Sequence, residues 1–296
     1  MTQLLLSINI PINPNIASFG GLLITWHGVF TAIGIVVGVW LAARIASSER
    51  VGIDPDTAYT LGMIIVACGI VGARLLYVVE RYGDSPSLDS PLDIFKINEG
   101  GISIYGAIIG GAIGGWAYAL KKRLPAAAGS DAAVFGMLAG LALGRIGDII
   151  NGEHYAKASD LPWAITYSHP DSPGFFRAPQ HPAVAYELIG DLVIMGILAF
   201  AWRMKLKPGI IFCLGFLLYA IMRFFVSLLR VDSKEPLLGL STPELTSLLV
   251  IVVMIPLMIF FARRPETEIH RMPSAAERSR LAMSRAERRR RLRTGP

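Results

Sequence analysis

Charged residues are scarce in this 296-residue chain: Asp, Glu, Lys and Arg together make up 17% of it. A soluble globular domain has roughly 25%. Hydrophobic residues make up 53% instead, and apolar stretches recur that are each long enough to cross a hydrocarbon core about 30 Å thick. The composition therefore excludes an ordinary soluble domain and predicts an all-α integral membrane protein.

Cysteine is also rare, with only Cys68 and Cys213 in the whole chain. Both fall within predicted membrane spans, which excludes the disulfide framework of a small secreted domain. We expect both to pack as small apolar side chains. The N-terminus lacks a basic region and an apolar core followed by a small-residue cleavage site, so no removable signal peptide is predicted.

Several motifs of lipid- and peptide-cleaving enzymes are missing as well. The sequence has no G-x-S-x-G nucleophile elbow, no H-E-x-x-H zinc helix and no dense Asp cluster for Mg²⁺. Small-xxx-small glycine spacings are present and predict close helix packing rather than phosphate loops, because no strand precedes them: Gly34/Gly38, Gly106/Gly110/Gly114 and Gly136/Gly140/Gly144.

About seven membrane spans are predicted, at residues 22–44, 57–79, 102–120, 131–150, 183–202, 208–229 and 243–262. The connections alternate in basic content. One set holds Arg44 and Arg50, then 121–123, then 203–207, then the C-terminal tail, whereas no Lys or Arg precedes the first span. By the positive-inside rule, the N-terminus is expected outside and the C-terminus in the cytoplasm.

The chain divides into a membrane domain, 1–262, and a short Arg-rich tail, 263–296. The tail holds eleven Arg and four Glu, a net charge of +7, whereas the first 262 residues sum to −1. It has too few apolar residues to fold alone. We expect a disordered cytoplasmic tail held at anionic lipid headgroups; nucleic-acid binding is the less favoured alternative.

Two outer loops, 80–101 and 151–182, are long enough to be lids or partner-binding elements, or else disordered. The second is expected to be ordered, because Trp163, Tyr167 and the pair Phe175–Phe176 give it apolar surface to bury.

Polar residues inside the spans are the strongest functional signal, since a charge there costs roughly 3 kcal/mol on insertion scales. On the predicted topology all of them lie in the outer half of the membrane. This favours a pocket open to the outer leaflet, where arginines suit a lipid phosphate, over a midplane transporter site. The alternative is that these groups pair internally, for instance Arg145 with Glu187 or Asp191, and only join helices. The residues are Arg74, Arg145, Asp148, Glu187, Asp191 and Arg223, with His27, Tyr105, Asn151, Tyr186, Tyr219 and Ser227.

The run from Gly144 to Glu153, G-R-I-G-D-I-I-N-G-E, resembles the G-R-x-G-N-F-x-N-G-E signature of the prolipoprotein diacylglyceryl transferases. The resemblance extends over about residues 20–262 in six collinear blocks. The other five are Trp26-His27-Gly28, 72–77 (G-A-R-L-L-Y), 100–106 (G-G-I-S-I-Y-G), His181-Pro182 with Tyr186-Glu187, and Tyr219 to Arg223-Phe224 and on to Arg230.

The resemblance implies a plasma-membrane enzyme that moves the diacylglyceryl group of phosphatidylglycerol onto the lipobox cysteine thiol of a prolipoprotein signal peptide, without a cofactor. By motif position, Arg145 and Arg223 would hold the phosphate and stabilise the departing glycerol phosphate. Asn151 and Glu153 would shape the headgroup pocket. The wider substrate-binding set would add Asp148, Arg74, Glu187 and Tyr219, and a base would accept the thiol proton.

The chain departs from the family pattern at six positions. Tyr105 replaces a histidine and His27 a tyrosine, so one hypothesis is that the two rings have exchanged places and His27 supplies the imidazole. A second is that neither ring is essential, and a third is a paralogue that binds lipid or peptide without catalysis. A small-solute transporter is the remaining alternative. The other departures are Asp148 for Asn, Val184 for Gln, Ser227 for Glu and Pro243-Glu244 for Gly-Gln.

Overall fold

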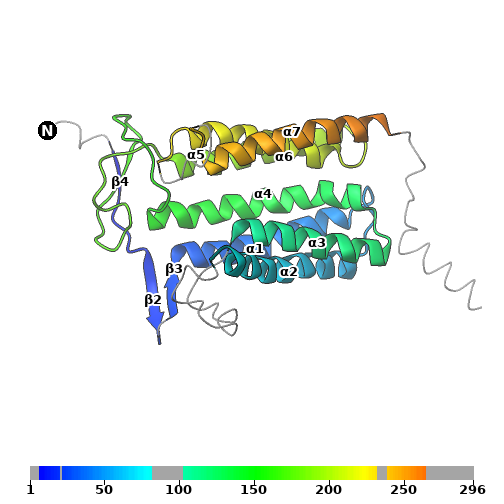
Figure 1. Ribbon diagram of the computed structural model, residues 1–296, viewed down its shortest axis with the longest axis horizontal. Helices are drawn as coiled ribbons and strands as arrows, with labels where there is room; N and C mark the ends of the chain where they lie inside the picture. Colours follow the sequence, from blue (N-terminus) through cyan, green and yellow to red (C-terminus); the bar gives the residue numbers. More distant parts are fainter. Residues whose placement is uncertain (1–6, 21, 82–102, 232–238, 265–296) are drawn as a thin grey trace, which may run out of the picture.

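The computed structural model describes residues 7–20, 22–81, 103–231 and 239–264, and helices dominate this part of the chain (Figure 1). The predicted loop 80–101 falls almost entirely outside the described residues, as does the tail beyond residue 264. The helices are α1 (Trp26–Ala46), α2 (Pro55–Arg81), α3 (Ile104–Lys122), α4 (Ala126–Asn151), α5 (Ala183–Arg203), α6 (Ile210–Ser227) and α7 (Thr242–Arg263).

Six of these seven helices are long and apolar enough to cross a membrane. The remaining one, α3, carries five glycines, which lower its mean hydropathy, but it runs alongside the others in the bundle (Figure 1). All seven predicted spans are therefore present as helices. The fourth continues through Arg145 and Asp148 to Asn151, although these charged residues interrupt its apolar pattern. The prediction of an all-α membrane protein is confirmed.

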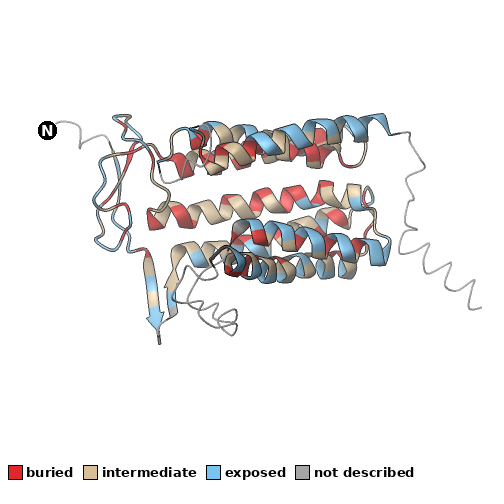
Figure 2. Ribbon diagram, viewed as in Figure 1, coloured by how far each residue is buried: buried red, intermediate tan, exposed pale blue. Residues whose placement is uncertain are grey.

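Helix α4 lies at the centre of the bundle, between a group formed by α1, α2 and α3 and a group formed by α5, α6 and α7 (Figure 1). It packs against α1, α5 and α6, while α2 packs against α3 and α6 against α7. The outward faces of the helices carry exposed large hydrophobic residues, such as Val36, Val79 and Val252, while α4 holds much of the buried surface (Figure 2). Apolar exposure of this kind suits contact with lipid chains.

The predicted glycine packing is confirmed at two helix pairs. A Cβ placed on Gly38 of α1 would lie 2.7 Å from the carbonyl oxygen of Gly136 in α4, and one on Gly72 of α2 would lie 2.4 Å from that of Gly106 in α3. Both distances are far below ordinary contact, so the backbones approach as closely as they do only because the side chains are absent. Gly144 is the exception, with no atom nearer than 4.0 Å.

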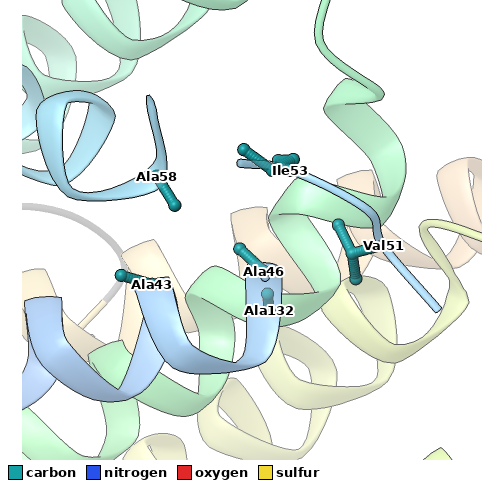
Figure 3. Packing of buried hydrophobic residues seen from close by; sticks show 6 residues of the cluster. All are labelled: Ala43, Ala46, Val51, Ile53, Ala58 and Ala132. Carbon is teal, nitrogen blue, oxygen red and sulfur yellow. The ribbon is translucent and has the colours of Figure 1, made fainter. Parts of the chain in front are cut away.

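The end of the bundle where α1, α3, α5 and α7 finish is closed by small apolar residues and by one carboxylate. Figure 3 shows the apolar cluster, in which Ala132 of α4 lies among residues from the α1–α2 connection and its flanking turns. The buried Asp131 accepts hydrogen bonds of 2.8 Å from the amides of Gly209 and Phe212, so a residue of α4 caps the start of α6. Basic residues occupy the last turns of the helices that end here: Arg44, Lys121, Lys122, Arg203 and Arg263.

The opposite end carries short strands that the sequence did not predict. Strand β1 (Ile8–Ile10) pairs in parallel with β4 (Ile165–Tyr167), and β2 (Asn15–Phe19) forms an antiparallel hairpin with β3 (Leu22–Thr25). Strand β4 lies in the second long loop, whose predicted order is confirmed.

Only part of the expected apolar surface of that loop is buried. Tyr167 is buried and donates a 2.9 Å hydrogen bond to the carbonyl of Ile149; burial raises the pKa of its phenol, so the hydroxyl remains a donor. The prediction was wrong for Phe176 and Trp163, whose side chains are 92% and 49% exposed. Trp163 instead donates a 2.8 Å hydrogen bond to the hydroxyl of Tyr186.

Candidate active site

Four helix termini bring the polar residues together at the strand-bearing end of the bundle. Helix α1 begins there, with the Thr25 hydroxyl accepting a hydrogen bond from the amide of Gly28, which places His27 in its first turn. Helix α4 ends there at Asn151, α5 begins there and α6 ends there (Figure 1). Consecutive helices alternate in direction, so residues far apart in sequence meet at one level.

A cluster of arginines surrounds the carboxylate of Glu187, whose side chain is 1% exposed. Arg145 of α4 lies 2.6 Å from its Oε2 atom, and Arg223 of α6 contacts its Oε1 atom. Arg230, just beyond α6, lies 3.3 Å from the same Oε1 atom. The predicted meeting of Arg145, Arg223 and Glu187 is confirmed. We refer to Arg145, Arg223, Arg230 and Glu187 together as the arginine cluster.

A histidine–aspartate pair adjoins the arginine cluster. Nδ1 of His27 lies 2.5 Å from Oδ1 of Asp148, and the other oxygen of Asp148 accepts a 2.9 Å hydrogen bond from Arg145. The Asp148 side chain is 4% exposed, whereas that of His27 is 42% exposed. A buried carboxylate thus holds the Nδ1 edge of the imidazole, while part of the ring remains exposed.

The end of α4 supplies a second connection to α1. The Oδ1 atom of Asn151 accepts a 3.3 Å hydrogen bond from the amide of His27, and its Nδ2 atom donates a 2.9 Å hydrogen bond to Glu153. Between them, Gly152 ends α4 with a φ of 78°, and a Cβ there would lie 2.3 Å from the Ser172 hydroxyl. The Asn-Gly-Glu run is therefore a turn that only glycine fits, and it directs both polar side chains toward His27.

Two contributors to the site were absent from the sequence-based set of candidates. Arg230 lies two helical turns beyond Arg223, a spacing that could have indicated a shared face. His154 lies near the start of the ordered loop, and its Nδ1 atom accepts a 2.8 Å hydrogen bond from Arg230 while its Nε2 atom lies 3.7 Å from Asp148. It adopts a left-handed backbone conformation with a φ of 65°. This conformation is part of the turn that begins at Gly152, and no local sequence pattern predicts it.

Among the residues that the structure describes, one combination has ligand atoms close enough to hold a metal ion. The ligand atoms of His27, Asp148 and Glu153 all lie within 4.8 Å of one another. The arrangement is satisfied without an ion, because His27 and Arg145 each take one oxygen of Asp148 and Asn151 binds Glu153. A guanidinium beside the same carboxylate also disfavours a cation there.

Comparison with known proteins gives a consistent result. The family model for prolipoprotein diacylglyceryl transferase matches residues 14–260. This chain is also similar to three proteins named phosphatidylglycerol–prolipoprotein diacylglyceryl transferase. It is 36% identical to the one from Frankia casuarinae, 34% to the one from Gloeobacter violaceus and 31% to the one from Dehalococcoides mccartyi. The matches cover 76%, 81% and 86% of this chain, and 55%, 89% and 96% of those relatives.

The chain belongs to the prolipoprotein diacylglyceryl transferase family. Its match to the Frankia casuarinae relative spans little more than half of that protein's length, whereas the other two are matched almost from end to end.

Of the remaining candidates, Tyr105 and Arg74 lie at the margins of the site, and Tyr219 lies beside Arg145. Tyr105, at the start of α3, is 38% exposed, and its hydroxyl lies 3.1 Å from the Thr246 hydroxyl of α7. Arg74 of α2 is buried, with its guanidinium 5.4 Å from the ring centre of Tyr77. Tyr219 packs against the apolar cluster that joins α4, α5 and α6.

Three of the departures from the family pattern have local structural roles. Val184 is buried in the first turn of α5. The Ser227 hydroxyl donates a 2.7 Å hydrogen bond to the carbonyl of Arg223 in its own helix. Glu244 accepts a 2.7 Å hydrogen bond from the amide of Ser241 and so caps α7. Of the other three, His27 and Asp148 contact each other, and Tyr105 contacts Thr246.

Proposed function

We propose that this protein transfers the diacylglyceryl group of phosphatidylglycerol to the thiol of a lipobox cysteine in a prolipoprotein. One observation carries the proposal: Arg145 and Arg223, from two helices, converge on a single anionic group at one end of an apolar bundle. The names and substrates of its relatives agree with it.

The arginines supply the electrostatic part of the reaction. A phosphodiester presents two charged oxygens, and planar guanidinium groups bind such pairs in a fixed geometry. Carbon–oxygen cleavage leaves a second negative charge on the glycerol phosphate, and fixed cations lower the barrier by stabilising that charge as it develops. Arg145 and Arg223 take this role, with Asn151 and Glu153 lining the position of the headgroup glycerol.

His27 is the residue best placed to remove the thiol proton. The Nδ1 atom of its imidazole is held by Asp148, so Nε2 is free to accept a proton from the cysteine. The thiolate sulfur then forms a bond to the terminal glycerol carbon of the lipid, the bond from that carbon to the phosphate oxygen breaks, and glycerol phosphate leaves. The hydroxyl of Tyr105 contacts Thr246 of α7 instead, so we do not assign Tyr105 as the base.

The site faces the outer leaflet of the plasma membrane in this proposal. Basic residues in the last turns of α1, α3, α5 and α7 support it, because they gather at the bundle end opposite the arginine cluster, where the positive-inside rule places the cytoplasm. The Arg-rich tail then follows α7 into the cytoplasm, where it would bind anionic headgroups.

A transfer assay tests the function directly. Purified protein in detergent micelles is incubated with phosphatidylglycerol and a signal peptide that carries a lipobox cysteine, and the peptide mass is measured. We expect a gain equal to one diacylglyceryl group with release of glycerol phosphate, and no gain with a Cys→Ser peptide or with Arg145→Ala. Lipid binding without any mass gain would instead identify a non-catalytic lipid-binding protein, a reading that the internal ion pairs of the arginines also permit.

The same variants can be examined in cells. A strain that lacks lipoprotein lipidation should be rescued by the unchanged chain and not by Arg145→Ala, with membrane levels of both proteins measured to exclude a loss of expression. Failure of the unchanged chain in both assays would contradict the proposal.

A further inference from the structure

Glu187 occupies the centre of the arginine cluster in the way that a bound anion would. Its two carboxylate oxygens face different guanidinium groups, with Arg145 at Oε2 and both Arg223 and Arg230 at Oε1. Two oxygens of a phosphate group would be held by the same donors in a similar fork. The carboxylate is 1% exposed, so water contributes little to its neutralisation.

Fixed negative charge beside the three guanidinium groups affects how strongly an anion binds to them. Glu187 contacts all three, and Asp148 contacts Arg145. Repulsion from these carboxylates acts more strongly on a phosphomonoester such as the released glycerol phosphate, which approaches two negative charges, than on a phosphodiester, which has one.

We propose that Glu187 is an internal competitor for the phosphate, which occupies Arg145 and Arg223 between turnovers and returns to them to expel glycerol phosphate. The inference rests on the proposed function and assigns Glu187 a positioning role, not contact with the reacting atoms. Since the carboxylate is tethered to the first turns of α5, it re-forms its ion pairs without any diffusion step. It therefore weakens binding of the anionic headgroup and product in exchange for faster release.

The neighbouring Asp191 provides a matched control. It lies one helical turn further along α5, is 1% exposed like Glu187, and has no hydrogen-bond partner for either carboxylate oxygen among the described residues. Glu187→Gln and Asp191→Asn therefore each replace a carboxyl group by an amide on the same helix at equal burial. Only the first removes the competitor of the arginines.

The test is binding of glycerol phosphate to the purified full-length protein in uncharged detergent, measured by the ligand-dependent shift of thermal unfolding. Glu187→Gln is expected to bind glycerol phosphate on the order of tenfold more tightly than the unchanged protein, and Asp191→Asn to bind it equally. The same thermal shift is measured with inorganic phosphate in a second arm and with phosphatidylglycerol added to the micelles in a third, and Glu187→Gln is expected to bind each more tightly than the unchanged protein does. Comparing the second and third arms separates free phosphate from lipid headgroup as the ligand.

Kinetics give a reading that a purely structural role would not produce. Glu187→Gln should lower both KM for phosphatidylglycerol and kcat, with stronger inhibition by glycerol phosphate, because product release becomes slower.

Equal or weaker glycerol phosphate binding by Glu187→Gln would overturn the proposal. If that variant does not fold, Glu187→Asp, which keeps the charge but withdraws it by one methylene, must still bind glycerol phosphate more tightly, and weaker binding would overturn the proposal. Absence of transfer by the unchanged protein would count against the proposed function alone, since anion binding is measured without catalysis.

Discussion

The imidazole of His27 and the carboxylate of Asp148 are 121 positions apart in the chain and are joined by a 2.5 Å contact between Nδ1 and Oδ1. Each residue departs from the family pattern, and each departure accounts for the other: the carboxylate near the end of α4 has a nitrogen to bind because the first turn of α1 holds a histidine. The pair resembles the base-and-orienting-acid arrangement found in many enzymes. Tyr105, the other residue in the exchange hypothesis, contacts Thr246 instead of this pair.

Replacement of His27 tests this pairing. General bases typically contribute about 100-fold or more to rate, so we expect His27→Ala to lower kcat for peptide lipidation by about 100-fold. Tyr105→Phe removes only the hydroxyl that contacts Thr246 and should change kcat by less than about 3-fold on the same grounds. The measurement is initial rate at saturating phosphatidylglycerol. Equal and small effects of both substitutions would eliminate His27 as the base.

The hydropathy and charge of the chain predict the seven helices and the gathering of polar residues at one end, because both follow from the requirement that a membrane span be apolar and ionic groups share a site. They do not predict which carboxylate each arginine selects. The alternative of internal pairing offered Glu187 or Asp191 as partners of Arg145, and the structure pairs it with Glu187 and Asp148. That selection depends on the rotation and depth of α4 against α5, which tertiary packing determines.

The cap over the site was the least predictable part. Strands β1 and β4 have three residues each and lie more than 150 positions apart, so neither has the length or alternation by which a strand is recognised. His154 lies outside the apolar spans, where a polar residue carries no signal of its own, and it becomes part of the site because Gly152 turns the chain at the end of α4. Arg230 directly follows α6 and belongs to a block of the family resemblance, where its spacing from Arg223 was the available signal.

Conservative replacement of the cluster arginines should separate charge from geometry. Lysine retains the positive charge but cannot form the planar fork of a guanidinium, so Arg145→Lys and Arg223→Lys should each lower kcat/KM for phosphatidylglycerol by about 100-fold. The matched control is Arg177→Lys, because Arg177 stacks on Tyr155 with its guanidinium 3.5 Å from the ring centre, outside the arginine cluster. Unchanged kinetics for both cluster variants would show that any positive charge is sufficient there.

Helix packing through glycine predicts a sharp difference between two Gly→Ala substitutions. A methyl on Gly72 would lie 2.4 Å from the backbone oxygen of Gly106, which cannot rotate away, whereas Gly196 of α5 has no atom within 4 Å of the corresponding position. Overpacking of this kind costs about 1–3 kcal/mol, so Gly72→Ala should unfold at a lower fraction of denaturing detergent than the unchanged protein. Gly196→Ala should unfold at the same fraction or a higher one, because alanine favours the helix. Equal midpoints for the two variants would contradict the close approach of α2 and α3.

Asp131 offers a test of stability at the end of the bundle that holds no active-site residue. Its carboxylate satisfies the amides of Gly209 and Phe212, both at 2.8 Å, and Asp131→Ala would leave these donors without that acceptor in a buried region. Loss of an N-cap together with an unsatisfied buried amide should reduce the free energy of unfolding by about 2–3 kcal/mol. Asp131→Asn keeps one acceptor oxygen and should lose about half as much. Asp54→Ala removes the acceptor of two hydrogen bonds at the start of α2, of 3.2 Å from the Thr57 amide and 3.3 Å from the Thr57 hydroxyl, and should cost about 1 kcal/mol. Helix content followed through a detergent titration ranks the three variants, and an Asp131→Ala protein as stable as Asp54→Ala would show that α6 begins without help from α4.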